Sequence, residues 1–274
     1  MLSAHLAPLS VATYLQRLYL VVKAIQQDAD VEWLKKPVAR LLNRAETVRN
    51  KTPMLVDSFR LFQAGLDLMA QAETSDIPNP RVRAIAYRDG LMVAFLAARP
   101  VRLQNLCSIR LGKHLRIDGN TAWVTYAAEE IKTRNALDFP WPDELMDHLT
   151  TYLTVHRPAL LDTGPMDALW MSRVGPMSKP GARIAIETST ERTLGIAISP
   201  HIFRDCAATT IAFLAPTEVH IIMSILGHSS LRTSQKHYNH ATSIMAGNRH
   251  QDMIANMRRN LRKKTRPSRR WSQK

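Results

Sequence analysis

The chain contains 274 residues, of which 45% are hydrophobic and 22% are charged, a composition that excludes disordered and fibrous proteins. Its formal net charge is +14. Because each lysine or arginine that meets a phosphate releases condensed counterions, so basic a chain predicts a polyanionic partner, and nucleic acid is the natural candidate.

The basic residues are concentrated towards the C-terminal end. Residues 258–274 contain nine lysines or arginines and no acid, so much of the net charge belongs to this tail. Such a segment is typical of a disordered arm that adds non-specific affinity for a nucleic-acid backbone. The alternative interpretation is a solubilising end.

The cysteines and the hydropathy of the chain indicate the cellular compartment in which the protein works. Cys107 and Cys206 are far apart, form no CxxC pair and occur in apolar helical contexts, which predicts buried thiols in a reducing compartment. The longest apolar run, residues 91–98, is far shorter than the roughly 20 residues of a membrane span. Residues 1–10 lack the basic start and apolar core of a secretion signal. We therefore expect a cytoplasmic, nucleoid-associated protein with no membrane partner.

Three helices are predicted in the first third of the chain. The first begins after Ser10 as N-cap and has apolar residues at three- and four-residue spacing. The second covers residues 31–47, where Pro37 marks either the first turn or a break, and the third covers residues 55–72. The polar, proline-containing stretch 73–80 is typical of a linker.

This linker divides the chain into a small helical domain of residues 1–76, a larger domain of residues 77–257, and the basic tail. In the larger domain, Asn79 as cap and Pro80 at the first helical position begin a long apolar helix that reaches Ala98. A second, short helix is expected over residues 103–109.

The pattern then changes period and predicts a small antiparallel sheet. From Pro142 onward the signals are helical again, with Ser199 and Pro200 starting one helix and Gly227 ending the next. The expected fold class is mainly α with a small antiparallel β-sheet, that is, α+β. Strands are expected at residues 115–117, 123–126 and 137–139, with an Asp118-Gly119 turn and an exposed turn at residues 132–135.

One short stretch near the end combines the groups needed to attack a phosphodiester. It contains His201-Ile202-Phe203-Arg204, then Leu226-Gly227-His228, then Tyr238. A tyrosine oxygen displaces an alkoxide from phosphorus if fixed guanidinium donors hold the non-bridging oxygens and a histidine manages protons. Such chemistry requires no metal and no other cofactor.

These motifs resemble those of the tyrosine recombinase (phage integrase) family. Its catalytic domain carries an arginine, a hairpin lysine, His-x-x-Arg, a Leu-Gly-His box and a tyrosine in that order, and each has a candidate here. The resemblance covers about residues 77–246. It implies a core-binding domain that clamps DNA at residues 1–76, followed by a catalytic domain.

The resemblance also implies a role for each group around the scissile phosphate. Tyr238 would be the nucleophile that forms a 3′-phosphotyrosyl link and frees a 5′-hydroxyl. Arg102 and Arg204 would clamp the two non-bridging oxygens, because the planar guanidinium fork matches phosphate geometry.

Three further side chains would handle protons. His201 would act as general base and later as acid, and His228 would bind a phosphate oxygen or assist that transfer. Lys132, in the turn between the second and third strands, would protonate the departing 5′-oxygen.

The first arginine is the least settled of the six positions. Arg99 and Arg102 both fit it, and we choose Arg102 because Leu106 and Ile109 then fall on an apolar face. Asn105 stands where the family often has glutamate, and Asp205 either orients His201 or is a surface acid.

The function predicted from the resemblance is that of a site-specific DNA recombinase or integrase. Its partners would be double-stranded DNA carrying a specific site, further copies of itself in a tetramer, and accessory DNA-bending proteins. A type IB topoisomerase and a catalytically silent DNA-binding regulator are the alternatives. A metallohydrolase built from the other histidines is disfavoured because its carboxylate ligands are not evident. The sequence reveals neither the target site nor the outcome of recombination.

Overall fold

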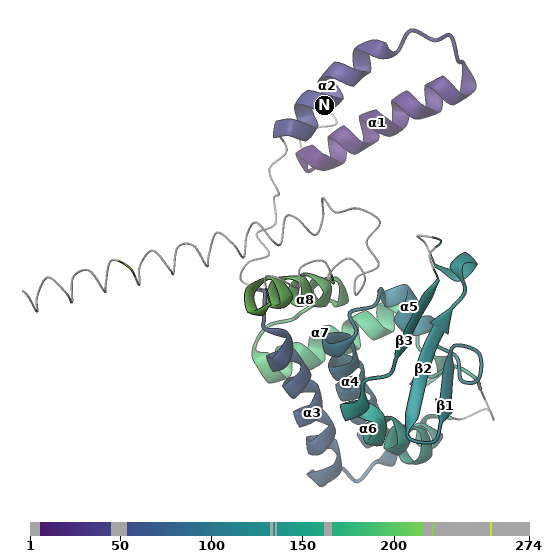
Figure 1. The fold of residues 1–274 in the computed structure, drawn as a ribbon, viewed down its shortest axis with the longest axis vertical. Coiled ribbons are helices and arrows are strands. Elements are labelled where there is room, and N and C mark those ends of the chain that lie inside the picture. The colour runs from purple at the N-terminus through teal and green to yellow at the C-terminus, as the bar shows by residue number, and fades with distance from the viewer. Residues whose placement is uncertain are drawn as a thin grey trace, which may run out of the picture. The chain divides into compact units, whose positions relative to one another are not determined.

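The computed structural model describes residues 6–44, 54–131, 134, 136–161, 166–215, 221 and 253. The described chain is mainly helical with two small antiparallel sheets, which confirms the predicted α+β class (Figure 1). It forms two compact units, Met1–Pro53 and Met54–Lys274. Three predicted site residues, Lys132, His228 and Tyr238, lie outside the described residues.

The first unit is a pair of helices. Helix α1 (Pro8–Ile25) begins before the predicted cap, with Ala7 as N-cap, because proline suits the first helical position. A short turn, η1 (Glu32–Leu34), leads into α2 (Lys35–Arg44), whose first turn contains Pro37. Contacts between the helices bury Ala12, Leu34 and Val38.

Two capped helices open the second unit. Helix α3 (Ser58–Thr74) is capped by Asp57, whose side chain accepts a hydrogen bond from the Phe59 amide at 2.6 Å. Helix α4 (Pro80–Ala98) begins at the predicted cap, since the Asn79 side chain accepts from the Arg81 amide at 2.9 Å. Both predicted ends of α4 are confirmed.

The α3–α4 crossing joins α3 to the second unit. A Cβ atom on Gly65 would lie 2.5 Å from the Ala94 amide nitrogen, and one on Gly90 would lie 2.8 Å from the Gly65 carbonyl oxygen. Only glycine allows backbones to approach so closely. Helix α3 therefore packs within the second unit, which begins after Pro53, and residues 75–79 connect two packed helices.

The predicted three-stranded sheet is present, with order β1-β2-β3 and both pairs antiparallel. In β2, exposed residues alternate with the buried Ala122, Val124 and Tyr126, as a half-buried strand requires. The strands are β1 (Leu115–Asp118), β2 (Thr121–Tyr126) and β3 (Leu137–Pro140).

A second hairpin interrupts the region predicted to be helical after Pro142. Its strands, β4 (Met171–Ser172) and β5 (Gly175–Pro176), have two residues each, which is too short to show a hydropathy period. The other elements are α5 (Leu103–Ser108), η3 (Ala128–Glu130), η4 (Asp143–Leu145), α6 (Met146–Thr151), η5 (Tyr152–His156), η6 (Pro158–Leu160), α7 (Lys179–Leu194) and α8 (Pro200–Leu214).

Helix α4 runs through the middle of the second unit, between α3 and the three-stranded sheet (Figure 1). Its residues 90–97 are all buried. On the sheet side, the ring of Phe95 stacks on Trp141 with centroids 4.4 Å apart. The core therefore fixes the C-terminal end of α4, from which the chain turns towards Arg102.

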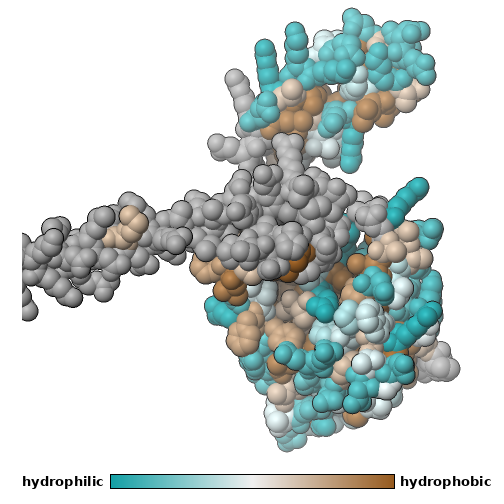
Figure 2. All heavy atoms as spheres, in the orientation of Figure 1, coloured by the Kyte–Doolittle hydropathy of each residue, from teal (hydrophilic) through white to brown (hydrophobic). Residues whose placement is uncertain are grey.

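Two hydrogen bonds attach the start of α3 to α8. The Val56 amide donates to the Cys206 sulfur at 3.3 Å, and the Ser58 amide donates to the Thr210 hydroxyl at 3.1 Å. At the other end of α8, Leu214 is 68% exposed, and Figure 2 shows hydrophobic residues gathered along this edge of the unit.

Candidate active site

Helix α8 carries two of the predicted catalytic side chains. Its first helical residue is Pro200, as predicted, and the buried Ile202 and Phe203 anchor it to the core. His201 is exposed, whereas Arg204, one turn later, is only 7% exposed. The spacing of three places both side chains on one face of the helix.

Arg204 reaches from α8 to the turn that follows α4. Its Nη1 atom donates to the Pro100 carbonyl oxygen at 2.6 Å. The pKa of its guanidinium is lowered to about 10, mainly because burial disfavours the charge and also because Arg102 is positive nearby, while Asp205 partly offsets both effects. Arg204 therefore stays charged at neutral pH, next to a second guanidinium.

The same turn decides between the two candidates for the first arginine. Arg102 is the N-cap residue of α5 and is half-buried. The Arg99 side chain instead turns to the sheet, where it donates to the carbonyl oxygens of Pro140 at 3.3 Å and Ala98 at 3.2 Å. The geometry thus brings Arg102, and not Arg99, to Arg204.

Helix α5 holds Arg102 against the core. Leu106 and Ile109 are fully buried, as expected from the apolar face on which the choice of Arg102 depends. Asn105 is also buried, and its carbonyl oxygen accepts hydrogen bonds from the Tyr126 hydroxyl and, at 3.1 Å, from the Ser108 hydroxyl. The position often taken by glutamate in the family is therefore part of the packing beneath the arginine.

Three tyrosines of the second unit are part of its packed core. Tyr87, Tyr126 and Tyr152 are at most 2% exposed. Burial raises the pKa of Tyr87 and Tyr152 to about 12 and that of Tyr126 further still. None of these phenols ionises readily, so none is suited to attack phosphorus.

The two thiols are likewise unsuited to nucleophilic attack. Cys206 is buried and Cys107 is half-buried, and neither forms a disulfide. Burial raises the pKa of both thiols to about 11, so the reactive thiolate is scarce at neutral pH.

A charged cluster near the sheet was not anticipated from the sequence. The carboxylate of Glu130 contacts Lys113 Nζ at 2.5 Å and His114 Nε2 at 3.2 Å. These bonds, with that of Lys113 the largest influence, lower the pKa of Glu130 to about 2. Sixteen or seventeen residues separate the partners, and no motif marks them.

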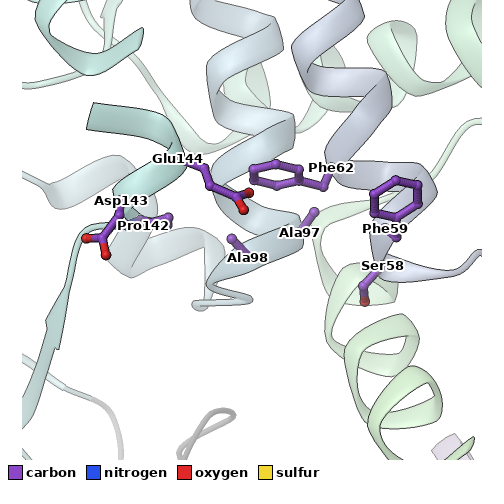
Figure 3. Close-up of a pocket in the computed structure, with 8 residues that line it drawn as sticks. All are labelled: Ser58, Phe59, Phe62, Ala97, Ala98, Pro142, Asp143 and Glu144. Atoms are coloured by element: carbon purple, nitrogen blue, oxygen red, sulfur yellow. The ribbon is translucent and has the colours of Figure 1, made fainter. Parts of the chain in front are cut away.

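A pocket on the second unit has a lining that differs in chemistry from the arginine site (Figure 3). Phe59 and Phe62 of α3 form one wall, and Asp143 and Glu144 of η4 form the other. Its lining contains no guanidinium or imidazole, and the two carboxylates would repel a phosphate. The pocket is therefore not part of the arginine site.

Metal ligands and membrane segments are both missing from the described part of the chain. There, no group of three or more His, Cys, Asp or Glu residues is placed to hold a metal ion. Within the same residues, no helix has the length and apolar character of a membrane span.

Comparison with known families identifies the family of this chain. Residues 66–244, more than half of the chain, match the model of the phage integrase family. The chain belongs to the phage integrase family. The match includes all six predicted site positions, from Arg102 to Tyr238.

Individual relatives cover the same region. This chain is 28% identical over 170 residues to tyrosine recombinase XerC of Anoxybacillus flavithermus, and the alignment covers 61% of this chain and 54% of the relative. It is 25% identical over 181 residues to tyrosine recombinase XerD of Staphylococcus aureus, covering 64% and 56%. The chain spans about half the length of the curated relatives it matches.

Two solved structures are similar in outline. The crystal structure of XerA recombinase has a TM-score of 0.48 and 17% identity, with 86% of this chain and 81% of that chain covered. The XerH site-specific recombinase bound to its difH substrate, a pre-cleavage complex, has a TM-score of 0.49 and 18% identity, with 68% and 50% covered.

Proposed function

We propose that this member of the phage integrase family is a site-specific DNA recombinase that cleaves and rejoins strands through a 3′-phosphotyrosyl intermediate. The observation that carries the proposal is the arginine pair. Arg204 is buried, donates to the Pro100 carbonyl at 2.6 Å, and lies near enough to Arg102 to lose basicity. Two like charges held together in a partly dry site favour an anion that both can bind.

A phosphodiester fits this pair. Each guanidinium donates to one non-bridging oxygen, and the charge that builds up on those oxygens at five-coordinate phosphorus is stabilised by donors already in position. Tyr238 attacks phosphorus as its proton passes to His201, on the same helix face as Arg204. The bond from phosphorus to the tyrosine oxygen forms, and the bond to the 5′-oxygen breaks.

The remaining predicted groups complete the cycle. Lys132 protonates the departing 5′-oxygen, and His228 hydrogen-bonds a phosphate oxygen. Because the phosphotyrosyl link retains the energy of the broken bond, the 5′-hydroxyl of a partner strand reverses the attack without ATP. Neither a metal nor a cofactor enters this sequence of steps.

The partner in this proposal is double-stranded DNA with a specific site, on which further copies of the chain assemble as a tetramer in the cytoplasm. The net charge of +14 and the match to the phage integrase family support DNA as the partner. Residues 1–76 would help to clamp the duplex, and accessory DNA-bending proteins would assist assembly.

A library of suicide duplexes tests the proposal whatever the target sequence is. Each duplex has randomised arms and a nick close to the central step, so that cleavage releases a short strand and leaves protein attached to DNA. Adducts that survive detergent are captured and sequenced. We expect one sequence family to be enriched with the native chain.

Substituting Tyr238 with phenylalanine provides the decisive comparison. The Tyr238→Phe variant should bind the enriched duplex with unchanged affinity and form no adduct, because it lacks the attacking oxygen. Adduct formation that survives the substitution would refute the assignment of the nucleophile. A type IB topoisomerase would also form adducts, but it would relax supercoiled plasmid without exchanging strands between two duplexes.

A further inference from the structure

Helix α5 presents Arg102 but is too short to hold it without help. It has six residues, and isolated helices of fewer than about 12 residues are marginal in water. The side chain of its N-cap, Arg102, does not cap the helix, because a guanidinium has no acceptor. The position of this helix, and with it the position of Arg102, therefore depends on contacts with the rest of the unit.

The turn before α5 is held by the other arginine of the site. Arg204 donates from Nη1 to the Pro100 carbonyl oxygen at 2.6 Å, and the next residue, Val101, is 7% exposed. These contacts fix the backbone just before Arg102. They act on one end of α5 only, so the other end needs contacts of its own.

The carbonyl oxygen of Asn105, towards that other end, lacks its usual helical partner. In a continuing helix it would accept from the Ile109 amide, but that amide donates to the Leu106 carbonyl at 3.4 Å instead. Asn105 is 5% exposed. A buried carbonyl without a donor is costly, so a donor from elsewhere in the unit is required.

Tyr126, the last residue of β2, supplies this donor. Its hydroxyl donates to the Asn105 carbonyl oxygen, and the Ser108 hydroxyl donates to the same oxygen at 3.1 Å. Burial raises the pKa of Tyr126, so its hydroxyl keeps the proton and remains a donor at neutral pH. Asn105 follows Arg102 by three residues, which is about 4.5 Å along a helix axis. The bond from the sheet therefore reaches α5 within one turn of the arginine.

His114 fixes the ring of Tyr126 in turn. The two rings stack with centroids 4.5 Å apart, and His114 is 4% exposed. Its Nδ1 atom accepts from the Arg110 amide at 3.1 Å, and its Nε2 atom faces the Glu130 carboxylate at 3.2 Å. A phenol that stacks on a ring held at both nitrogens has little freedom to move.

We propose that Tyr126 is a positioning residue, which sets Arg102 at its non-bridging oxygen by holding the end of α5. This inference rests on the proposed recombinase function. Without the hydroxyl, the end of α5 would shift towards another donor, and Arg102 would move with it. Arg204 would keep its place, because it belongs to α8, which the buried Ile202 and Phe203 anchor to the core.

A substrate that lacks one charged oxygen separates displacement of Arg102 from general damage. A methyl group in place of one non-bridging oxygen of the scissile phosphate removes the acceptor at this position and the negative charge of the group. The probes are the duplex enriched by the native chain and its two methylphosphonate diastereomers, which have the methyl group in one or the other non-bridging position. Single-turnover rates of adduct formation are measured on all three duplexes.

Arg102→Ala identifies the diastereomer whose methyl group takes the place of the oxygen that Arg102 binds. Loss of Arg102 should cost least on that duplex, because its acceptor is already absent. On the other diastereomer the oxygen facing Arg102 is retained, and the loss should remain large. The same pair of duplexes then shows whether a second variant acts through Arg102.

We expect Tyr126→Phe to slow cleavage of the phosphodiester at least about 10-fold, a part of the 10²–10³-fold that one donor to a developing oxyanion supplies. On the diastereomer that Arg102→Ala identifies, its rate should equal that of the native chain. On the other diastereomer it should stay at least about 10-fold slower. Ser108→Ala removes the second donor to the same carbonyl and should show this pattern with a smaller loss, so it provides the test if Tyr126→Phe does not fold.

Tyr87→Phe is the matched control. Tyr87 is 1% exposed, and its hydroxyl contacts Nδ1 of His148, in α6, at 3.0 Å. The substitution therefore also removes one hydrogen bond from a buried phenol, but one that does not reach α5. It should lower the melting temperature about as much as Tyr126→Phe does and cleave all three duplexes at the native rate.

Three outcomes would overturn the proposal. Cleavage of the phosphodiester at the native rate by Tyr126→Phe would show that the hydroxyl positions nothing. An equal loss on all three duplexes would show a merely structural role, and so would the same pattern in Tyr87→Phe. Absence of any adduct from the native chain would instead refute the recombinase function, and this inference with it.

Discussion

Arg204 and Glu130 are held in opposite ways. Arg204 lies in the interior and is fixed by a backbone carbonyl, whereas Glu130 remains partly exposed and is fixed by two charged or polar side chains. A buried charge is screened little by salt, and a surface ion pair is screened strongly. The proposed phosphate clamp of Arg102 and Arg204 should therefore keep its geometry across salt concentrations at which the Lys113–Glu130 pair weakens.

Arg204 and Glu130 also differ in how strictly the geometry of the side chain matters to its contacts. A guanidinium in a packed site has one arrangement, and its fork cannot be replaced by a point charge. A carboxylate at the surface has room to adjust, and its loss removes one of several contacts that hold this part of the chain. Substitutions in the interior should therefore have the larger effects.

The largest effect is expected from replacing the clamp with lysine. Arg204→Lys and Arg102→Lys should each slow adduct formation by about 10²–10³-fold, the usual loss when one donor to a developing oxyanion is removed. Arg99→Lys is the matched control, since Arg99 faces Pro140, and it should change the rate less than about threefold. The measurement is the single-turnover rate on the enriched duplex. A control as slow as the Arg102 variant would transfer the role to Arg99.

The α3–α4 crossing tests how rigid the interior is. A Cβ atom at Gly65 would meet the Ala94 amide nitrogen at 2.5 Å, so Gly65→Ala should lower the free energy of unfolding by about 1–3 kcal/mol. Ala70→Ser, on the exposed side of the same helix, adds one atom without a clash and should change it by less than about 0.5 kcal/mol. Chemical denaturation of the full chain measures both values. Equal stabilities would mean that the two helices move apart at little cost.

The smallest effect concerns a buried histidine whose pKa is lowered by burial. His156 is 4% exposed and stacks on Tyr87 with centroids 4.0 Å apart. Burial lowers its pKa, and Glu73 only partly opposes this. Because the folded-state pKa lies below that of the unfolded chain, the contribution to stability is complete above about pH 6.5 and declines as pH falls below it.

Thermal unfolding between pH 7.5 and pH 5 checks this sign. The melting temperature of the native chain should fall with pH, and His156→Phe, which retains an aromatic ring but cannot bind a proton, should reduce the slope. A slope unaffected by His156→Phe would exclude this histidine as its source.

The local features of this molecule were predictable from sequence. The cap at Asn79, the end of α4 at Ala98, the β1–β2 hairpin and the start of α8 at Pro200 each follow from a few neighbouring residues. Such signals act over one or two turns of chain, and the structure confirms them.

Features that depend on distant residues were not predictable in the same way. The Gly65–Gly90 approach, which moves the boundary between units to Pro53, arises only when two helices cross. The Lys113–His114–Glu130 cluster likewise joins residues with no shared motif.

The candidate site also contains some features that local motifs predict and others that depend on distant residues. The choice of Arg102 as partner of Arg204 was predicted from motif order, but the contact of Arg204 with the Pro100 carbonyl and that of Arg99 with the Pro140 carbonyl depend on the folded turn. The roles of Lys132, His228 and Tyr238 remain predictions.

The attachment of Val56 and Ser58 to Cys206 and Thr210 has a mechanical consequence. These residues lie at the start of α3, so a displacement of this end of α3 would act directly on the helix that carries His201 and Arg204. The first turn of α3 is therefore coupled to the two candidate side chains on α8 by two hydrogen bonds.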